Sequence, residues 1–225
     1  MTGIFITASG TEVGKTYVTA AMIRGVLLKG GSPRALKPII TGFSPETMMT
    51  SDSAILLNTL GQIPCIETIG IISPWRFGPP LSPDMAAAFE GEEINHRAVI
   101  AHSLGGLEDT AKTTLIEGIG GVMVPLNKTT TVLDWIEALK IPAILVVGSY
   151  LGTISHTLTA INALKSRDIP INGIVISESE ESPVPPELTK TSILNFTLDI
   201  NVLTLKRGQP DDETCILLSD LITLD

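Results

Sequence analysis

The clearest chemistry in this sequence lies in the run 11–16, Thr-Glu-Val-Gly-Lys-Thr. The apolar residues 4–6 precede it and a helical pattern at 17–28 follows, so we expect a strand, a tight turn and a helix in that order. Such a turn directs backbone N–H groups and the positive end of a helix dipole at one spot, which suits an anion. Lys15 can neutralise phosphate charge there, and the Thr16 hydroxyl can bind Mg²⁺. The run predicts a nucleoside triphosphate site.

This turn departs from the strict phosphate-loop pattern, G-x-x-x-x-G-K-[ST]. Ser9 stands where the pattern places its first glycine, and Ala8 stands where a longer variant would place it. We expect Gly10 to supply the backbone freedom instead. The competing interpretation is an ordinary helix start with Thr16 as its cap and Lys15 in solvent. The order of strand, loop and helix favours the phosphate site.

A lysine closes the next apolar run. Lys37 lies near the end of a predicted strand at 34–40, which Pro38 interrupts, and Thr41 follows with a hydroxyl. A lysine at this place can stabilise charge that develops on a transferred phosphoryl group. A surface lysine before a proline-induced break accounts for the same spacing.

Two acidic residues are candidates for the metal side of the site. Glu117 ends the apolar strand predicted at 113–116, and Gly118 and Gly120 after it allow close approach of the backbone to a ligand. A carboxylate there can bind Mg²⁺. Asp52 opens a predicted helix, where it is either a second metal carboxylate or a simple helix cap. Local sequence does not choose between the two.

A third candidate segment follows the strongest apolar run, at 142–147. Residues 151–156 begin a helix, and the N–H groups and hydroxyls there could receive a substrate carboxylate. The alternative is ordinary capping by Thr153 or Ser155.

Strands and helices must alternate to position these residues. We expect further strands at 171–176 and 202–205, an ordered loop at 66–83, an exposed loop at 177–187, and helices at 52–60, 83–89, 95–108, 132–139, 153–166 and 213–221. This alternation predicts an α/β fold of one domain, residues 1–225, with a doubly wound, mostly parallel sheet and helices on both faces. The residues after the strands should then meet at one edge of the sheet.

Composition narrows the class of protein. The chain has 225 residues, of which 44% are hydrophobic and 17% charged, and a net charge of −9. The acidic balance argues against nucleic acid or a membrane surface as partner. No stretch approaches the ~20 apolar residues of a membrane span. The N-terminus lacks a signal-peptide pattern, and Cys65 and Cys215 form no pair motif, so we expect a cytoplasmic protein with free thiols.

Taken together, these runs resemble the dethiobiotin synthetase family, the ATP-dependent cyclising ligases of biotin biosynthesis. The resemblance extends from the N-terminus to about residue 176. It rests on the order and spacing of Thr11 to Thr16, Lys37-Pro38, Thr41-Gly42, Ser51-Asp52, Pro80, Ser82-Pro83, Glu117-Gly118, Gly120-Gly121, Pro125-Leu126, Asp134-Trp135, Leu151-Gly152 and His156.

The resemblance implies a reaction of 7,8-diaminononanoate, CO₂ and ATP through a carbamate and a carbamic–phosphoric anhydride. It implies Lys37 and Lys15 as catalytic residues and Mg²⁺ held by Thr16, Asp52 and Glu117. The nucleotide would lie against Glu12, Val13, Gly14, Lys15, Thr16, Tyr17, Asp52, Glu117, Gly118, Ile119, Gly120, Ser177, Glu178 and Thr204. The substrate would lie against Thr41 and, from the neighbouring subunit of a homodimer, Leu151, Gly152 and Ser155.

Two departures from the family pattern lie where the family contacts the adenine base of ATP. Ser177 stands where the family commonly has an asparagine that reads adenine, and Thr204 lies near the place of a proline against the base. They leave open whether ATP or another nucleoside triphosphate is preferred. Competing functions are a regulatory ATPase switch of the partition or cell-division type and a small-molecule kinase. The sequence lacks the switch proteins' additional lysine, since Gly10 stands in its place, and it lacks an arginine-rich lid.

Overall fold

The computed structural model describes residues 3–223, which build one six-stranded sheet and a small two-stranded sheet. The large sheet has the strand order β2-β5-β1-β6-β7-β8, and every pairing in it is parallel. Its strands are β1 (Gly3–Ala8), β2 (Pro33–Leu36), β5 (Thr113–Glu117), β6 (Ala143–Val147), β7 (Ile171–Ser177) and β8 (Val202–Leu205). The expected doubly wound fold is confirmed, with β1 in the middle of the sheet.

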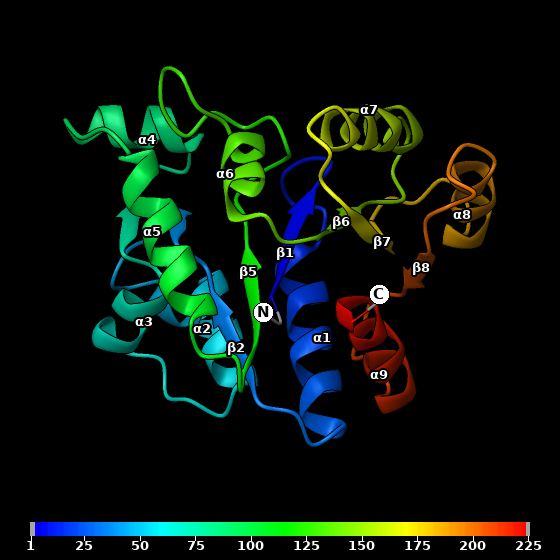
Figure 1. Ribbon diagram of the computed structural model, residues 1–225, viewed down its shortest axis with the longest axis horizontal. Coiled ribbons are helices and arrows are strands. Elements are labelled where there is room, and N and C mark those ends of the chain that lie inside the picture. Colours follow the sequence, from blue (N-terminus) through cyan, green and yellow to red (C-terminus); the bar gives the residue numbers. More distant parts are fainter. Residues whose placement is uncertain (1–2, 224–225) are drawn as a thin grey trace.

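Helices cover both faces of this sheet (Figure 1). α1 (Lys15–Leu28) and α9 (Asp212–Asp220) pack together on one face, and α2 (Asp52–Thr59) lies against α1. The other face is covered by α5 (His96–Leu107), α6 (Val132–Leu139), α7 (Thr153–Lys165) and α8 (Pro186–Leu194). Buried apolar side chains of β1, β6 and β7 fill the space on each side, as the continuous apolar runs of these strands predict.

The structure corrects the strand expected at 34–40. β2 ends at Leu36, and β3 (Ile39–Thr41) leaves the large sheet to pair in parallel with β4 (Trp75–Phe77). Pro38 lies between the two strands and has no N–H to continue the ladder. Lys37 is therefore the last residue before the chain turns away from the sheet.

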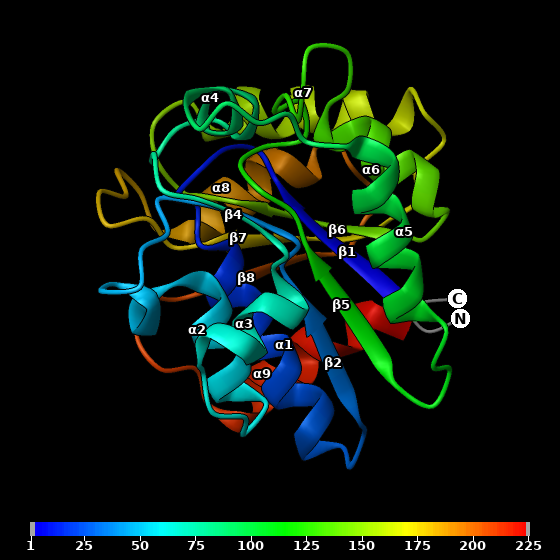
Figure 2. The same cartoon turned by 90° about the vertical axis from the view of Figure 1, so that its left-hand side faces the viewer.

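The expected loop at 66–83 was wrong for most of its length. It contains α3 (Ile66–Ile72) and β4, and it is followed by α4 (Pro83–Phe89). A capping box between Cys65 and Thr68 starts α3, and the helix ends just before Pro74. Figure 2 shows α2 and α3 side by side next to β2. α8 was also not predicted, because Pro185 and Pro186 suggested a loop, although proline is well tolerated at the first turn of a helix.

No helix in residues 3–223 has both the length and the apolar character needed to cross a bilayer.

Candidate active site

The start of α1 forms an open anion site. Gly14 adopts the left-handed conformation at φ 87° and ψ 25°, and no described side chain caps the helix that follows. The first N–H groups of α1 are therefore available to a ligand. A Cβ on Gly14 would also collide with the Ser177 side chain. The freedom expected of Gly10 is found instead at Gly14 and at Glu12, whose φ is 55°.

Parallel register brings Lys37 and Glu117 together. Leu36 of β2 pairs with Ile116 of β5, so the residues that follow them, Lys37 and Glu117, lie next to each other at the end of their strands. The Lys37 Nζ lies 2.7 Å from Glu117 Oε1 and donates to the Gly118 carbonyl at 2.9 Å. Both side chains are buried, with 3% and 0% exposed. The surface-lysine interpretation of Lys37 is wrong.

Asp52 completes an ion cluster around Lys37. Its Oδ2 lies 3.0 Å from the Lys37 Nζ, while its side chain stays 43% exposed to the cavity. Burial opposes the charge on Lys37, but the Glu117 and Asp52 carboxylates outweigh it and hold the pKa of Lys37 above its ordinary value. The pKa of Asp52 is lowered, because Lys37 outweighs the effect of burial. Asp52 is thus more than a helix cap, and the Ser51 hydroxyl accepts the capping hydrogen bond of α2 instead.

Lys15 is held by backbone carbonyls. Its Nζ donates to Gly120 O at 2.9 Å and to Gly10 O at 3.3 Å. Burial and the neighbouring charge of Lys37 lower the pKa of Lys15 to about 8. A phosphate bound at this place would put a negative charge beside Lys15 and raise its pKa again.

The residues around Glu117 fit a divalent cation. The Thr16 hydroxyl donates to Glu117 Oε1 at 2.8 Å, and Glu117 Oε2 is buried without a hydrogen-bond partner among residues 3–223. An orphaned carboxylate oxygen is costly unless a cation or water meets it. Hydroxyl and carboxylate oxygens are the ligands that Mg²⁺ prefers. The described residues hold no cluster of three acidic, histidine or cysteine side chains, so phosphate and water oxygens would have to complete the coordination.

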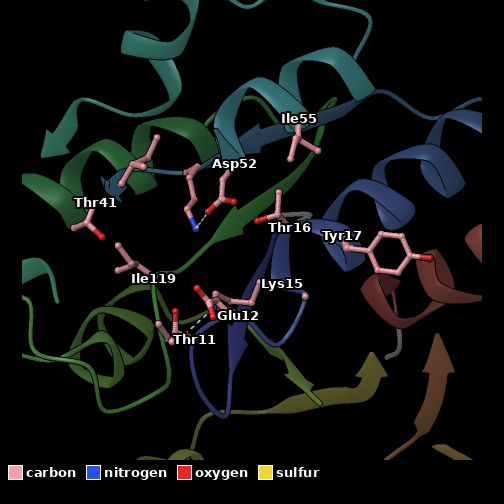
Figure 3. Close-up of a pocket in the computed structure, with 13 residues that line it drawn as sticks. Thr11, Glu12, Lys15, Thr16, Tyr17, Thr41, Asp52, Ile55 and Ile119 are labelled. Carbon is pink, nitrogen blue, oxygen red and sulfur yellow. Dashed lines mark hydrogen bonds and ion pairs between the residues drawn. The ribbon is translucent and has the colours of Figure 1, made fainter. Parts of the chain in front are cut away.

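Glu117 is buried in contact with Lys37 and Thr16, and these two residues line one cavity of about 440 Å³ together with Lys15 and Asp52. Figure 3 shows Thr16 and Asp52 on one side of it and Thr41 across from them. Two residues that were not predicted as site residues, Ile40 and Ile55, also line it, together with Thr11 from the start of the predicted phosphate-loop run. Thr11 and Ile40 each adjoin a predicted site residue, whereas Ile55 lies one turn after Asp52 on α2 and could have been found from helical spacing.

A second cavity of about 440 Å³ adjoins the first at the start of α1. It shares Glu12, Gly14 and Tyr17 with the first cavity and reaches the predicted residues Val13, Ser177 and Glu178. It also contains residues that were not predicted: Ser179, Glu180, Arg207 and Gly208. Arg207 and Gly208 follow β8, so the rule that ligands lie beyond the carboxyl ends of strands could have identified them.

Other predicted residues lie outside both cavities. Leu151 is 89% exposed and adjoins a separate hollow with Glu180 to Pro183, and Gly152 and Ser155 at the start of α7 are exposed as well. Thr204 on β8 faces Glu187, with 3.5 Å between the hydroxyl and Oε1. Gly118 packs against Phe5, since a Cβ on Gly118 would lie 2.8 Å from the ring. Its carbonyl accepts a hydrogen bond from Lys37. The residues that follow Gly118, Ile119 and Gly120, do line the first cavity.

Comparison with known proteins decides the family. A family model described as an AAA domain matches residues 2–204. The ATP-dependent dethiobiotin synthetase of Acidiphilium cryptum is 48% identical over 195 residues, which cover 86% of this chain and 87% of that protein. That of Methylobacterium nodulans is 41% identical over 92% of this chain and 94% of that protein. The chain belongs to the ATP-dependent dethiobiotin synthetase family.

Solved structures support the fold of this dethiobiotin synthetase family member. The MinC:MinD cell division complex of Aquifex aeolicus aligns with a TM-score of 0.54 at 12% identity, covering 98% of this chain and 92% of that one. A putative plasmid partition protein from Borrelia burgdorferi bound to AMPPNP aligns with a TM-score of 0.53 at 15% identity, covering 99% and 90%. Likeness at this identity shows a shared fold and gives no support to the partition-switch function.

Proposed function

We propose that this chain forms the ureido ring of dethiobiotin from 7,8-diaminononanoate, CO₂ and ATP. One observation carries the proposal: Lys37 is buried between Glu117 and Asp52, in the same cavity as Lys15 and Thr16 of the phosphate loop. Binding a triphosphate alone requires only the phosphate loop. A second buried cation, Lys37, held between two carboxylates, suits a reaction in which another anion must be held against the γ-phosphate.

The reaction proceeds in three balanced steps. An amine of the substrate attacks CO₂ and loses a proton, which gives a carbamate. A carbamate oxygen then attacks the γ-phosphorus, and the bond from that phosphorus to the ADP oxygen breaks. Finally, the second amine attacks the carbamate carbon, loses a proton and expels inorganic phosphate. Lys15 and the α1 N–H groups hold the phosphates, and Lys37 neutralises the carbamate and the transferred phosphoryl group.

The cation site takes part by charge neutralisation. Thr16, Asp52 and Glu117 would hold Mg²⁺, which supplies positive charge to the β- and γ-phosphates when bound. Asp52 and Glu117 also face Lys37. In this proposal the two carboxylates therefore position both Lys37 and the cation beside the triphosphate.

The substrate's far end belongs to a different surface in this proposal. Thr41 lies in the cavity and is suited to contact the reacting end of the diamine. Leu151, Gly152 and Ser155 lie outside it, which supports a homodimer in which they receive the substrate carboxylate for the partner's cavity. We place this reaction in the cytoplasm and assign it to the whole chain, 1–225, as one ligase domain.

The proposal is tested by following ADP release while each substrate is omitted in turn. Release should require both the diamine and bicarbonate, because neither the carbamate nor the anhydride forms without them. ATP hydrolysis at the same rate with neither present would contradict the ligase and favour an ATPase switch.

A further inference from the structure

The segment 206–208 is tied to α1 by a tyrosine hydroxyl. The Tyr17 Oη donates to the Lys206 carbonyl across 2.8 Å, and it makes a second, short contact with the Gly208 carbonyl. One phenolic proton is thus shared between two acceptors of the same segment. Figure 3 shows Tyr17 directed away from Thr16 and Asp52, toward β8 and α9. The side chain therefore takes no part in the ion cluster of the first cavity.

The same segment is held from its other side by Glu178. The Arg207 N–H donates to Glu178 Oε2 at 3.0 Å, and the Glu178 N–H donates to the Leu205 carbonyl at 2.9 Å. Residues 206–208 are exposed, and Gly208 has a φ of 101°. Few apolar contacts stabilise such a segment, so hydrogen bonds to its neighbours decide where it lies.

Arg207 and Gly208 of this segment line the second cavity together with the neighbouring segment Ser177 to Glu180. A triphosphate bound at Gly14 and Lys15 in the first cavity must direct its nucleoside into adjoining space. The second cavity offers that space, because it shares Glu12, Gly14 and Tyr17 with the first. Its volume of about 440 Å³ lies in the range of small-molecule sites.

We propose that Tyr17 is a positioning residue for the nucleoside: its hydroxyl fixes residues 206–208 as a wall of the second cavity and thereby sets the affinity for the nucleoside part of ATP, without acting on the phosphates. This inference rests on the proposed ATP-dependent function. Burial raises the pKa of the Tyr17 phenol, so the hydroxyl stays a donor at neutral and mildly alkaline pH.

The test compares ATP with inorganic tripolyphosphate, which has no nucleoside, by calorimetric titration of the wild type and Tyr17→Phe. We expect Tyr17→Phe to weaken ATP binding about two- to tenfold, the range that one net hydrogen bond provides. Tripolyphosphate binding should not change. In turnover, the KM for ATP should rise by the same factor, with a much smaller change in kcat.

A matched control is Tyr150→Phe. The Tyr150 hydroxyl bonds to His156 Nδ1 at 2.8 Å and lies outside both cavities, so this variant should bind ATP like the wild type. Backbone amide exchange gives a readout without ligand: residues 206–208 should exchange faster in Tyr17→Phe, while residues 11–16 exchange as before.

Each remaining outcome has a defined meaning. Equal ATP affinity in wild type and Tyr17→Phe would overturn the positioning role. Equal losses for ATP and tripolyphosphate would overturn it too, because Tyr17 would then act through the phosphate loop. If the wild type bound neither ligand, the proposed function itself would fail, and this inference with it.

Discussion

The two cavities that meet at the start of α1 are built in different ways. In the first, Lys37 lines the cavity and pairs with Glu117, and both are buried charges at neighbouring strand ends whose positions follow from sheet register. The second is bounded by exposed or half-buried loop residues after β7 and β8, such as Glu178 and Arg207, which hydrogen bonds hold in place. Removing a buried charge leaves its partner uncompensated, whereas loosening a loop costs about one hydrogen bond. We therefore expect changes in the first cavity to abolish chemistry and changes in the second to tune affinity.

The strongest test of this contrast is Lys37→Ala. We expect turnover to fall about a thousandfold or more, because the charge that develops on the carbamate and the phosphoryl group loses its buried cation. Steady-state ADP release with both substrates measures the loss, and circular dichroism checks the fold. Lys112→Ala is the matched control, since Lys112 lies just before β5, at the end of the strand opposite Glu117. Near-normal turnover of Lys37→Ala would remove Lys37 from the mechanism.

A smaller effect should come from the protonation of Lys15. Its pKa of about 8 lies below the ordinary value of 10.5, so the free protein loses this charge as the pH rises through 8. The affinity for tripolyphosphate should fall above pH 8, by at most about tenfold per pH unit. Lys15→Arg stays charged and should flatten this profile.

The titration of Lys15 does not destabilise the fold over this pH range, so unfolding does not explain a fall in tripolyphosphate affinity above pH 8. Between pH 8 and 10.5 the unfolded chain binds more protons at Lys15 than the folded one, so the contribution of Lys15 to the free energy of unfolding rises with pH. A wild-type affinity that stays constant from pH 7 to pH 9.5 would show that Lys15 keeps its charge in the free protein.

The smallest expected effect is on selectivity for the nucleotide base. Ser177 is buried beside Gly14 and offers one short hydroxyl to a nucleoside in the second cavity. We expect the KM values for ATP, CTP and GTP to lie within about tenfold of one another, since one hydrogen bond discriminates weakly. Ser177→Ala should narrow these ratios further. A preference for ATP above about a hundredfold would mean that other groups of the cavity read the base.

The sequence allowed prediction of the first cavity more fully than of the second. Buried parallel strands appear as continuous apolar runs, and the residues at their ends, Lys37 and Glu117, meet because parallel strand ends share one edge. The contact between them, the burial of Lys37 and its pairing with Asp52 depend on register and on the break at Pro38. Local sequence does not fix these long-range features.

Loops and short helices were less predictable. The wall at 206–208 depends on hydrogen bonds from Tyr17 and Glu178, which lie far away in the chain and have no periodic pattern. α3 was missed because Pro74, Pro79, Pro80 and Pro83 indicated a loop over residues 66–83, although the capping residues Cys65 and Thr68 precede all four prolines. The left-handed conformation fell on Glu12 and Gly14 instead of Gly10, because the path of the loop between β1 and α1 determines which residue turns.

The proposed function requires the first cavity to join a CO₂-derived group to a diamine while one ATP is consumed. Mass spectrometry of the product made from 7,8-diaminononanoate, ¹³C-bicarbonate and ATP tests it most directly. We expect a cyclic urea that carries one labelled carbonyl carbon and has lost two N–H hydrogens, formed together with ADP and phosphate. A phosphorylated diamine without labelled carbon, or unchanged diamine beside accumulating ADP, would contradict it.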